Sequence, residues 1–190
     1  MYSTWCLPLY RVSTFSQPHS STLLDGHPTD SSLFLESATA DGEGVVQLFE
    51  ILKNGHIQLL WTYRVRNTTT MAAALFPNDG SLALVSQNNN KLISVFLVDR
   101  RRMMQVSEWL EIEDEIGDEI GQLEISKCGN TAFILGQEGH SNNISKVFLV
   151  KITPLLSLEL ISQKIIHQKV KSVLIFNETR QGFYLALKIL

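Results

Sequence analysis

Two charged stretches are the first parts of this sequence whose composition suggests chemistry. The stretch EWLEIEDEIGDE, residues 108–119, carries seven carboxylates and no basic side chain. It lacks the alternating oxygen ligands and the glycine of a calcium-binding loop. The remaining interpretations are a docking site for a basic partner and a solvated connection between strands. The second is favoured, because charge runs are usually solvated.

Three consecutive arginines, Arg100, Arg101 and Arg102, come shortly before this acidic stretch. Guanidinium groups can pair with phosphate oxygens through two parallel hydrogen bonds, so the cluster is a candidate contact for RNA or for a protein partner. The alternative is that these arginines pair with the carboxylates of 108–119. The three arginines are therefore the candidate contact residues of the chain.

No set of residues with the spacing of a catalytic or metal site stands out. A nucleophile elbow G-x-S-x-G and a phosphate loop GxxxxGK[ST] are both absent. The histidines are dispersed and suggest no zinc site. They are His19, His27, His56, His140 and His167. The sequence thus predicts no catalytic, cofactor-binding or metal-binding residues, no cofactor and no small-molecule substrate, and the protein is predicted not to be an enzyme.

The overall composition is that of a globular protein with no strong electrostatic preference. The chain has 190 residues, of which 44% are hydrophobic and 18% charged, and its formal net charge is −3. No apolar run approaches the roughly 18 residues that a membrane span needs. The N-terminus lacks the basic and apolar regions of a signal peptide. Its two cysteines are too few for a disulfide framework. We expect a nuclear or cytoplasmic protein that is neither secreted nor bound to a membrane.

The elements that must position any site are short apolar strands joined by turns. Residues 71–99 show this most clearly: an apolar run, the turn Pro77-Asn78-Asp79-Gly80, and two further strands. Residues 120–151 repeat the pattern. The two turn glycines, Gly80 and Gly129, are 49 residues apart. Upstream, Asn54-Gly55 is the strongest hairpin signal in the chain.

A repeat of roughly 40–50 residues with several strands each is typical of β-propeller blades. The sequence predicts an all-β protein, a partial (incomplete) β-propeller of about three to four blades. We divide the chain into an irregular or disordered segment, 1–29, and the propeller, 30–190. The predicted blades are 30–70, 71–119, 120–169 and an incomplete 170–190. Because the last repeat stops in an apolar strand, we expect a truncated product or a fragment of a longer protein, in preference to a chain that pairs with a partner to complete the ring.

Aromatic residues recur on the outgoing strands of successive repeats, at Phe49, Phe96 and Phe148. Such rings can form a stacking platform for nucleic-acid bases. Their position inside strongly apolar strands favours packing in the core between blades instead.

Two segments resemble repeats of the WD40 family. SATADG (37–42) followed by VQLFE (46–50) resembles the third strand, turn and closing dipeptide of a WD40 repeat, with Phe-Glu in place of Trp-Asp. LFPNDGSLA (75–83) resembles the inner-strand segment of such a repeat. The Gly-His dipeptide that usually opens a repeat is missing. The resemblance implies WD40-like blades and an interaction scaffold.

A narrower resemblance concerns the C-terminal part. QKIIHQKV (163–170) and FNETRQGFY (176–184) resemble the last blades of the non-catalytic WD-repeat subunits of tRNA (guanine-N7) methyltransferase. This resemblance implies a scaffold that supports tRNA N7-methylguanosine formation in the nucleus by holding a separate catalytic methyltransferase subunit and helping to seat the tRNA. The family's partner-contacting residues lie in blades that do not align with this chain, so the resemblance identifies no contact residue here.

Two other functions remain open on the sequence alone. One is a general protein–protein interaction adaptor of the WD40 class, with 108–119 as its docking surface. The other is a propeller enzyme such as a lactonase. A lactonase needs Asp, Glu, Asn and His side chains that converge from several inner strands. The predicted inner strands carry Ala, Leu, Ile and Phe instead, so this function ranks last.

Overall fold

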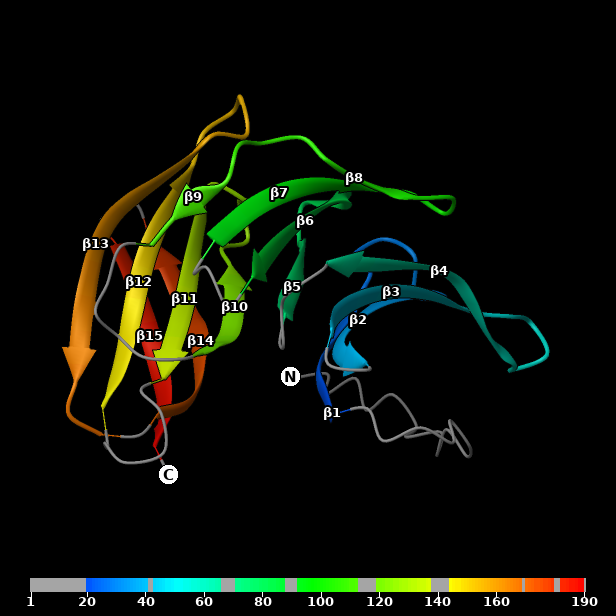
Figure 1. Ribbon diagram of the computed structural model, residues 1–190. Coiled ribbons are helices and arrows are strands. Elements are labelled where there is room, and N and C mark those ends of the chain that lie inside the picture. Colours follow the sequence, from blue (N-terminus) through cyan, green and yellow to red (C-terminus); the bar gives the residue numbers. More distant parts are fainter. Residues whose placement is uncertain are drawn as a thin grey trace, which may run out of the picture.

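The computed structural model describes residues 20–40, 43–65, 71–87, 92–112, 119–137, 144–168, 170–179 and 182–189. All regular secondary structure in these ranges is β-strand, and the strands form separate antiparallel sheets. The sheets stand side by side along an open arc (Figure 1). None of the described residues belongs to a helix long and apolar enough to cross a membrane.

The first sheet is a four-stranded meander in the order β1-β2-β3-β4. Its strands are β1 (Ser20–Gly26), β2 (Leu33–Ala40), β3 (Glu43–Ile51) and β4 (Ile57–Val65). The turn between β3 and β4 contains Asn54-Gly55, and Gly55 adopts a φ of 80°. This left-handed conformation favours glycine, so the predicted hairpin at Asn54-Gly55 is confirmed.

The second sheet contains the strands predicted from 71–99. Its strands are β5 (Met71–Phe76), β6 (Asp79–Gln87), β7 (Leu92–Val98), β8 (Met103–Gln105) and β9 (Leu110–Glu111). The order is β5-β6-β7-β8, and the short β9 also pairs with β7. A register shift between Leu75 and Phe76 lets the chain close the tight turn at Pro77 and Asn78.

The third sheet repeats the first in topology, and a two-stranded hairpin follows it. The strands of the third sheet are β10 (Glu119–Ile125), β11 (Thr131–Gln137), β12 (Ser145–Ile152) and β13 (Leu158–Ile166). The hairpin consists of β14 (Val170–Thr179) and β15 (Gly182–Ile189). Three sheets of four to five strands and one hairpin confirm the predicted all-β, partial β-propeller.

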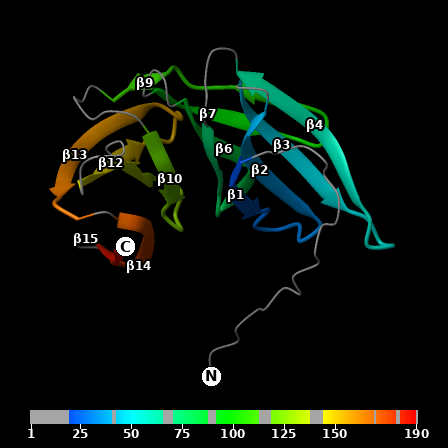
Figure 2. The same cartoon turned by 60° about the horizontal axis from the view of Figure 1, so that its bottom comes forward.

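The first strand of each sheet lies on the inner side of the arc. β1 and β2 contact β5, β5 contacts β10, and β10 contacts β14, whereas β4, β8 and β13 stand at the far ends of their sheets. Figure 2 shows β1 and β10 facing the hollow of the arc from its two sides. The inner strands therefore form the wall of a propeller axis.

The core lies between neighbouring sheets and is built from their apolar faces. One cluster joins the second and third sheets, and another joins the first and second. Phe49, Phe96 and Phe148 are 4%, 0% and 3% exposed, which confirms the predicted role of these rings in the core.

Strand β1 falls within 1–29, where we expected an irregular segment. It pairs with β2 over Ser20–Gly26, and Ser21 and Leu23 mark a register shift. The polar composition of this segment shows no strand pattern. Its strand forms through hydrogen bonds to β2, which local composition does not indicate. Residues 1–19 lie outside the described part of the chain, and the division into blades at 70, 119 and 169 remains a prediction.

Candidate active site

Two carboxylates from different sheets line one pocket on the inner wall. Asp25 lies near the end of β1, and Glu124 lies near the end of β10. Both line a pocket of about 200 Å³ whose remaining wall comes from β5, the strand between them, and from neighbouring residues of β10. The complete lining is Asp25, Ala73, Ala74, Leu75, Pro77, Gln122, Leu123, Glu124 and Ile125.

Asp25 is partly buried and is held by the backbone of the next sheet. Its Oδ2 accepts a hydrogen bond from the backbone N–H of Leu75 at 2.7 Å. Burial raises the pKa of Asp25 above its ordinary value, and hydrogen bonds from the backbone of Leu75 and Gly26 oppose this rise. These two donors stabilise the charged form of Asp25 at a site where burial alone would disfavour it.

Glu124 is also partly buried, but no such donor supports it. Burial is the main cause that raises the pKa of Glu124, and the negative charge of Asp25 raises it further. No hydrogen bond to the Glu124 carboxyl occurs within the described ranges. Of the two groups, Glu124 is therefore the one that the surroundings favour in its protonated form.

The repeat of the chain brings these two side chains together. Asp25, Leu75 and Glu124 follow one another at intervals of 50 and 49 residues, so they occupy equivalent positions on three successive inner strands. The middle position supplies a backbone donor, and the outer two supply carboxylates. The arrangement places two carboxyl groups beside one small cavity, and the surroundings of one of them favour its protonated form, as general acid–base catalysis requires.

The sequence pattern does not reveal this pair, for two reasons. Asp25 lies in the segment 1–29 that was predicted to be irregular, and Glu124 lies in a strand whose pattern is mainly apolar. The expectation that the inner strands carry no converging carboxylates was therefore wrong. An alignment of the repeats within the sequence would have indicated the pair, because Leu24-Asp25 and Leu123-Glu124 occupy matching positions before their turns.

The predicted contact residues Arg100, Arg101 and Arg102 lie in the loop between β7 and β8. Arg100 forms ion pairs with Asp30 at 2.9 Å and with Glu50. Arg102 lies 3.9 Å from Asp99. In these ion pairs Arg100 and Arg102 therefore contact carboxylates that lie outside the acidic stretch 108–119. Residues 113–118 of that stretch lie outside the described ranges.

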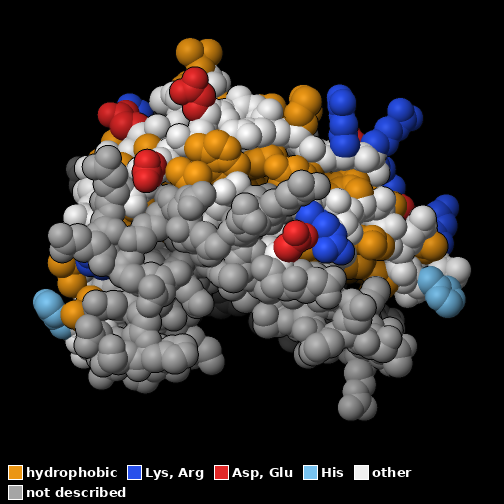
Figure 3. All heavy atoms as spheres, viewed as in Figure 1, with side chains coloured by type: hydrophobic (Ala, Val, Ile, Leu, Met, Phe, Trp, Pro, Cys, Tyr) orange, Lys and Arg blue, Asp and Glu red, His pale blue; other side chains and the backbone are white. Residues whose placement is uncertain are grey.

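The charged side chains on the face seen in Figure 3 do not form one continuous basic area. Most of the blue Lys and Arg atoms lie on the right of the described part of this face and most of the red Asp and Glu atoms on the left, with orange and white atoms between them. A long nucleic acid is attracted by a continuous basic surface, and the described part of this face offers none.

The described residues contain no group of three or more His, Cys, Asp or Glu side chains placed to hold a metal ion. Cys128 is free and exposed. His19, His140 and Cys6 lie outside the described ranges. Two carboxyl groups suffice for proton transfer, so the Asp25–Glu124 pair can supply that chemistry.

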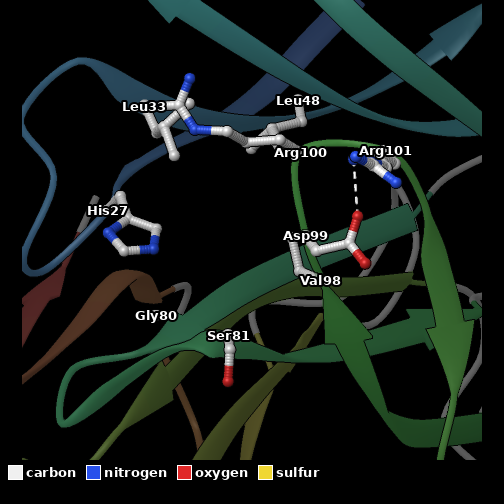
Figure 4. A pocket seen from close by; sticks show the side chains of 9 residues that line it. All are labelled: His27, Leu33, Leu48, Gly80, Ser81, Val98, Asp99, Arg100 and Arg101. Carbon is white, nitrogen blue, oxygen red and sulfur yellow. Dashed lines mark hydrogen bonds between the residues drawn. The ribbon is translucent and has the colours of Figure 1, made fainter.

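A second and larger cavity, of about 540 Å³, lies between the first and second sheets. It is bordered by the loop after β1, the beginning of β6, and the loop after β7 (Figure 4). Arg100 and Arg101 belong to its lining, together with His27 and Asp99.

Comparisons by sequence found no relative: no protein-family model matches the chain, and no curated protein matches it. Comparison of the fold found solved structures that are similar. A protein from Lactobacillus plantarum aligns with a TM-score of 0.63 at 12% identity, covering 88% of this chain and 48% of its own.

Two further similar structures carry functional names. The periplasmic gluconolactonase of Pseudomonas aeruginosa aligns with a TM-score of 0.58 at 17% identity, covering 75% of this chain and 39% of its own. A protein from Bacteroides uniformis assigned as a 6-phosphogluconolactonase aligns with a TM-score of 0.53 at 16% identity, covering 75% of this chain and 42% of its own. This chain thus spans less than half the length of each of these three structures.

These comparisons contradict the WD-repeat interpretation. The two structures named above for a function are lactonases and not WD-repeat subunits of a tRNA methyltransferase, and no WD-repeat family model matches. The predicted non-catalytic role in tRNA methylation was therefore wrong, together with the predicted methyltransferase and tRNA partners. The segments that carried the resemblance are short strand–turn–strand units, and propellers of different families share such units because they share blade geometry.

The same neighbours also contradict two predicted absences. The names gluconolactonase and 6-phosphogluconolactonase denote enzymes that act on small molecules, at odds with the predictions that this chain is not an enzyme and has no small-molecule substrate. At identities below 20%, the likeness itself establishes the fold, a propeller of the kind seen in lactonases.

Proposed function

We propose that this chain forms the catalytic wall of a propeller enzyme that hydrolyses a lactone, with Asp25 and Glu124 as its acid–base pair. One observation carries the proposal: two carboxyl groups whose pKa values are raised by burial line the same small pocket on the inner strands. Perturbed carboxyl groups in a concave site are typical of general acids and bases.

The surroundings of the two groups suggest different roles. The backbone N–H of Leu75 favours the ionised form of Asp25, which makes Asp25 the base. Glu124 is favoured in its protonated form by burial and by the charge of Asp25, which makes Glu124 the acid. Neighbouring carboxyl groups whose environments differ in this way commonly divide the two tasks.

Hydrolysis of a lactone needs both tasks. Asp25 takes a proton from water while the water oxygen attacks the lactone carbonyl carbon. Glu124 then gives its proton to the ring oxygen as the bond between that oxygen and the carbonyl carbon breaks. The product is the open-chain hydroxy acid, and transfer of a proton from Asp25 back to Glu124, directly or through water, restores the starting state.

A sugar-derived lactone is the substrate class that fits the pocket best. Two structural neighbours are named for lactones of this class. The pocket of about 200 Å³ has carboxyl and amide groups from Asp25, Glu124 and Gln122 that can meet hydroxyl groups, and an apolar wall from β5. Polar groups arranged against an apolar wall are typical of small-molecule sites.

The test is a hydrolysis assay with glucono-δ-lactone, followed by proton release above the spontaneous rate. We expect the wild-type chain to accelerate hydrolysis, and Asp25→Asn and Glu124→Gln each to lower kcat by about 10²- to 10⁴-fold, the usual contribution of a general acid or base. Glu111→Gln, which changes an exposed carboxylate on β9, is the matched control and should leave the rate unchanged. A wild-type chain with no acceleration, or two variants as active as the control, would contradict the proposal.

A further inference from the structure

We propose that the cavity between the first and second sheets is a binding site for a small organic carboxylate. Its volume of about 540 Å³ falls within the roughly 300–1,000 Å³ of typical small-molecule sites. It is formed by residues other than those of the Asp25–Glu124 pocket, so this inference does not depend on the proposed lactone hydrolysis.

His27 supplies the first recognition group. Its Nδ1 accepts a hydrogen bond from the backbone N–H of Asp30 at 3.0 Å. A neutral imidazole with Nδ1 as acceptor carries its proton on Nε2, so Nε2–H is a donor. Figure 4 shows the Nε2 side of the ring turned toward the cavity. No acceptor for Nε2–H occurs among the residues that the structure describes.

Gly80 is needed for this placement of the His27 ring. A β-carbon at Gly80 would overlap with Cε1 and Nε2 of His27 and would lie 2.8 Å from its Cδ2. Any side chain at this position would therefore displace the imidazole from the edge of the cavity. The absence of a side chain at Gly80 leaves room for the ring and keeps its donor beside the cavity.

The charged groups around the cavity leave one further donor without an acceptor. Arg100 is held by Asp30 and Glu50. Asp99 accepts hydrogen bonds from the backbone N–H groups of Arg101 and Arg102, at 2.6 and 2.9 Å, and these bonds lower its pKa. The guanidinium of Arg101, by contrast, makes no hydrogen bond within the described ranges.

The balance of these groups points to the chemistry of the ligand. Each of the three carboxylates near the cavity already has a donor, whereas Nε2–H of His27 and the Arg101 guanidinium have none of the described acceptors. A bound molecule with acceptor oxygens can use both donors, and a carboxylate supplies such oxygens together with a charge opposite to that of Arg101. A ligand can accept hydrogen bonds from these two donors without breaking a hydrogen bond between described residues of the protein.

The rest of the cavity suits a hydrocarbon body. Leu33, Leu48 and Val98 line it and are 7%, 1% and 4% exposed. Figure 4 shows the aliphatic part of Arg100 lying between Leu33 and Leu48. A compact apolar group attached to a carboxylate therefore matches both the lining and the two donors of His27 and Arg101.

The test compares benzoate with benzamide, which has a similar shape and no charge, by calorimetric titration of the full chain. We expect saturable benzoate binding that is at least tenfold tighter than benzamide binding. The imidazole NMR signals of His27 should shift with the same dissociation constant. Absence of saturable benzoate binding at millimolar concentration, or equal binding of the two probes, would overturn the proposal.

Two pairs of variants locate the binding site. Arg101→Gln removes a guanidinium that lines the cavity, and Arg102→Gln is its matched control because Arg102 does not line the cavity. Gly80→Ala displaces His27, and Gly26→Ala is its control because no atom lies within 4 Å of the added carbon. We expect at least tenfold weaker benzoate binding in Arg101→Gln and Gly80→Ala, and less than twofold change in both controls. Equal effects of Arg101→Gln and Arg102→Gln would contradict the assignment even if Gly80→Ala fails to fold.

Discussion

The Oδ2 atom of Asp25 accepts a hydrogen bond from the backbone N–H of Leu75 at 2.7 Å, across 50 residues of sequence. The two residues belong to β1 and β5, the inner strands of two different sheets. The bond therefore ties neighbouring blades at the axis and also fixes the orientation of one carboxylate in the candidate active site. The same side chain serves both the stability of the fold and the proposed chemistry.

This double role predicts a difference between two substitutions of Asp25. Asp25→Leu leaves the N–H of Leu75 without an acceptor and should lower the free energy of unfolding by about 1–3 kcal/mol. Asp25→Asn keeps an acceptor oxygen and should cost less than about 1 kcal/mol. Urea denaturation measures both, and equal costs would show that the bond to Leu75 does not stabilise the fold.

The carboxyl of Glu124 predicts a pH-dependent stability. Because burial and Asp25 raise its pKa in the folded state, the folded chain binds the proton more tightly than the unfolded chain does. Its contribution to stability is greatest below the unfolded value, near pH 4.5, and is lost as the pH rises through the folded pKa. Glu124→Gln cannot ionise, so its melting temperature should exceed that of the wild type by a margin that grows from acidic to neutral pH. A margin that is constant with pH, or that shrinks, would contradict the raised pKa, and Glu111→Gln provides the baseline.

The turns of neighbouring blades also contact each other. The side-chain amide of Asn78, in the turn after β5, donates to the backbone oxygen of Cys128, in the turn after β10, at 2.9 Å. Next to Cys128, Gly129 adopts a φ of 72°, and a β-carbon there would overlap with the Asn78 side chain. Gly129→Ala thus adds a steric clash to an unfavourable backbone conformation.

Gly55→Ala separates these two effects. Gly55 has a φ of 80° but no atom within 4 Å of an added β-carbon, so its substitution carries the conformational cost alone, about 1 kcal/mol. Gly129→Ala should cost about 1–2 kcal/mol more, as overpacked sites do. Adding Asn78→Ala to Gly129→Ala should recover part of that excess, in a double-mutant cycle by urea denaturation. A cycle with no coupling between the two positions would show that the turns do not depend on each other.

Phe96 predicts the largest loss of stability. Its ring is fully buried between the first and second sheets and packs edge-on against Tyr63 and Trp109, at 5.4 and 5.8 Å between ring centroids. Phe96→Ala should cost about 3–5 kcal/mol, the usual loss for a buried aromatic ring. Leu155→Ala, at a side chain that is 91% exposed, should change stability by less than about 0.5 kcal/mol. Similar losses in both variants would contradict the assignment of the core.

The sequence predicts the blades well because their signals are local. The turn at Pro77 to Gly80 and the hairpin at Asn54-Gly55 depend on residues within a few positions of each other, and apolar alternation identifies the strands on either side. Repetition of the unit adds the fold class, since stacked blades are the stable way to bury such faces. The buried Phe96 follows from the same pattern.

The candidate site could not be predicted in the same way because it depends on contacts between sheets. Asp25 and Glu124 are 99 residues apart, and only the placement of β1 and β10 on either side of β5 brings them into one pocket. Within their own strands each looks like a single polar residue. Likewise, the partners of Arg100 are Asp30 and Glu50, which lie in another blade and not in the neighbouring acidic stretch.

The most direct test of the proposed acid–base pair is the pH dependence of kcat/KM for lactone hydrolysis. The wild type should give a bell-shaped profile, because Asp25 must be ionised and Glu124 protonated. Glu124→Gln should lose the fall at high pH, and Asp25→Asn should lose the fall at low pH, each at a much reduced maximum. Profiles of unchanged shape in both variants would contradict the assignment of catalysis to these two carboxyl groups.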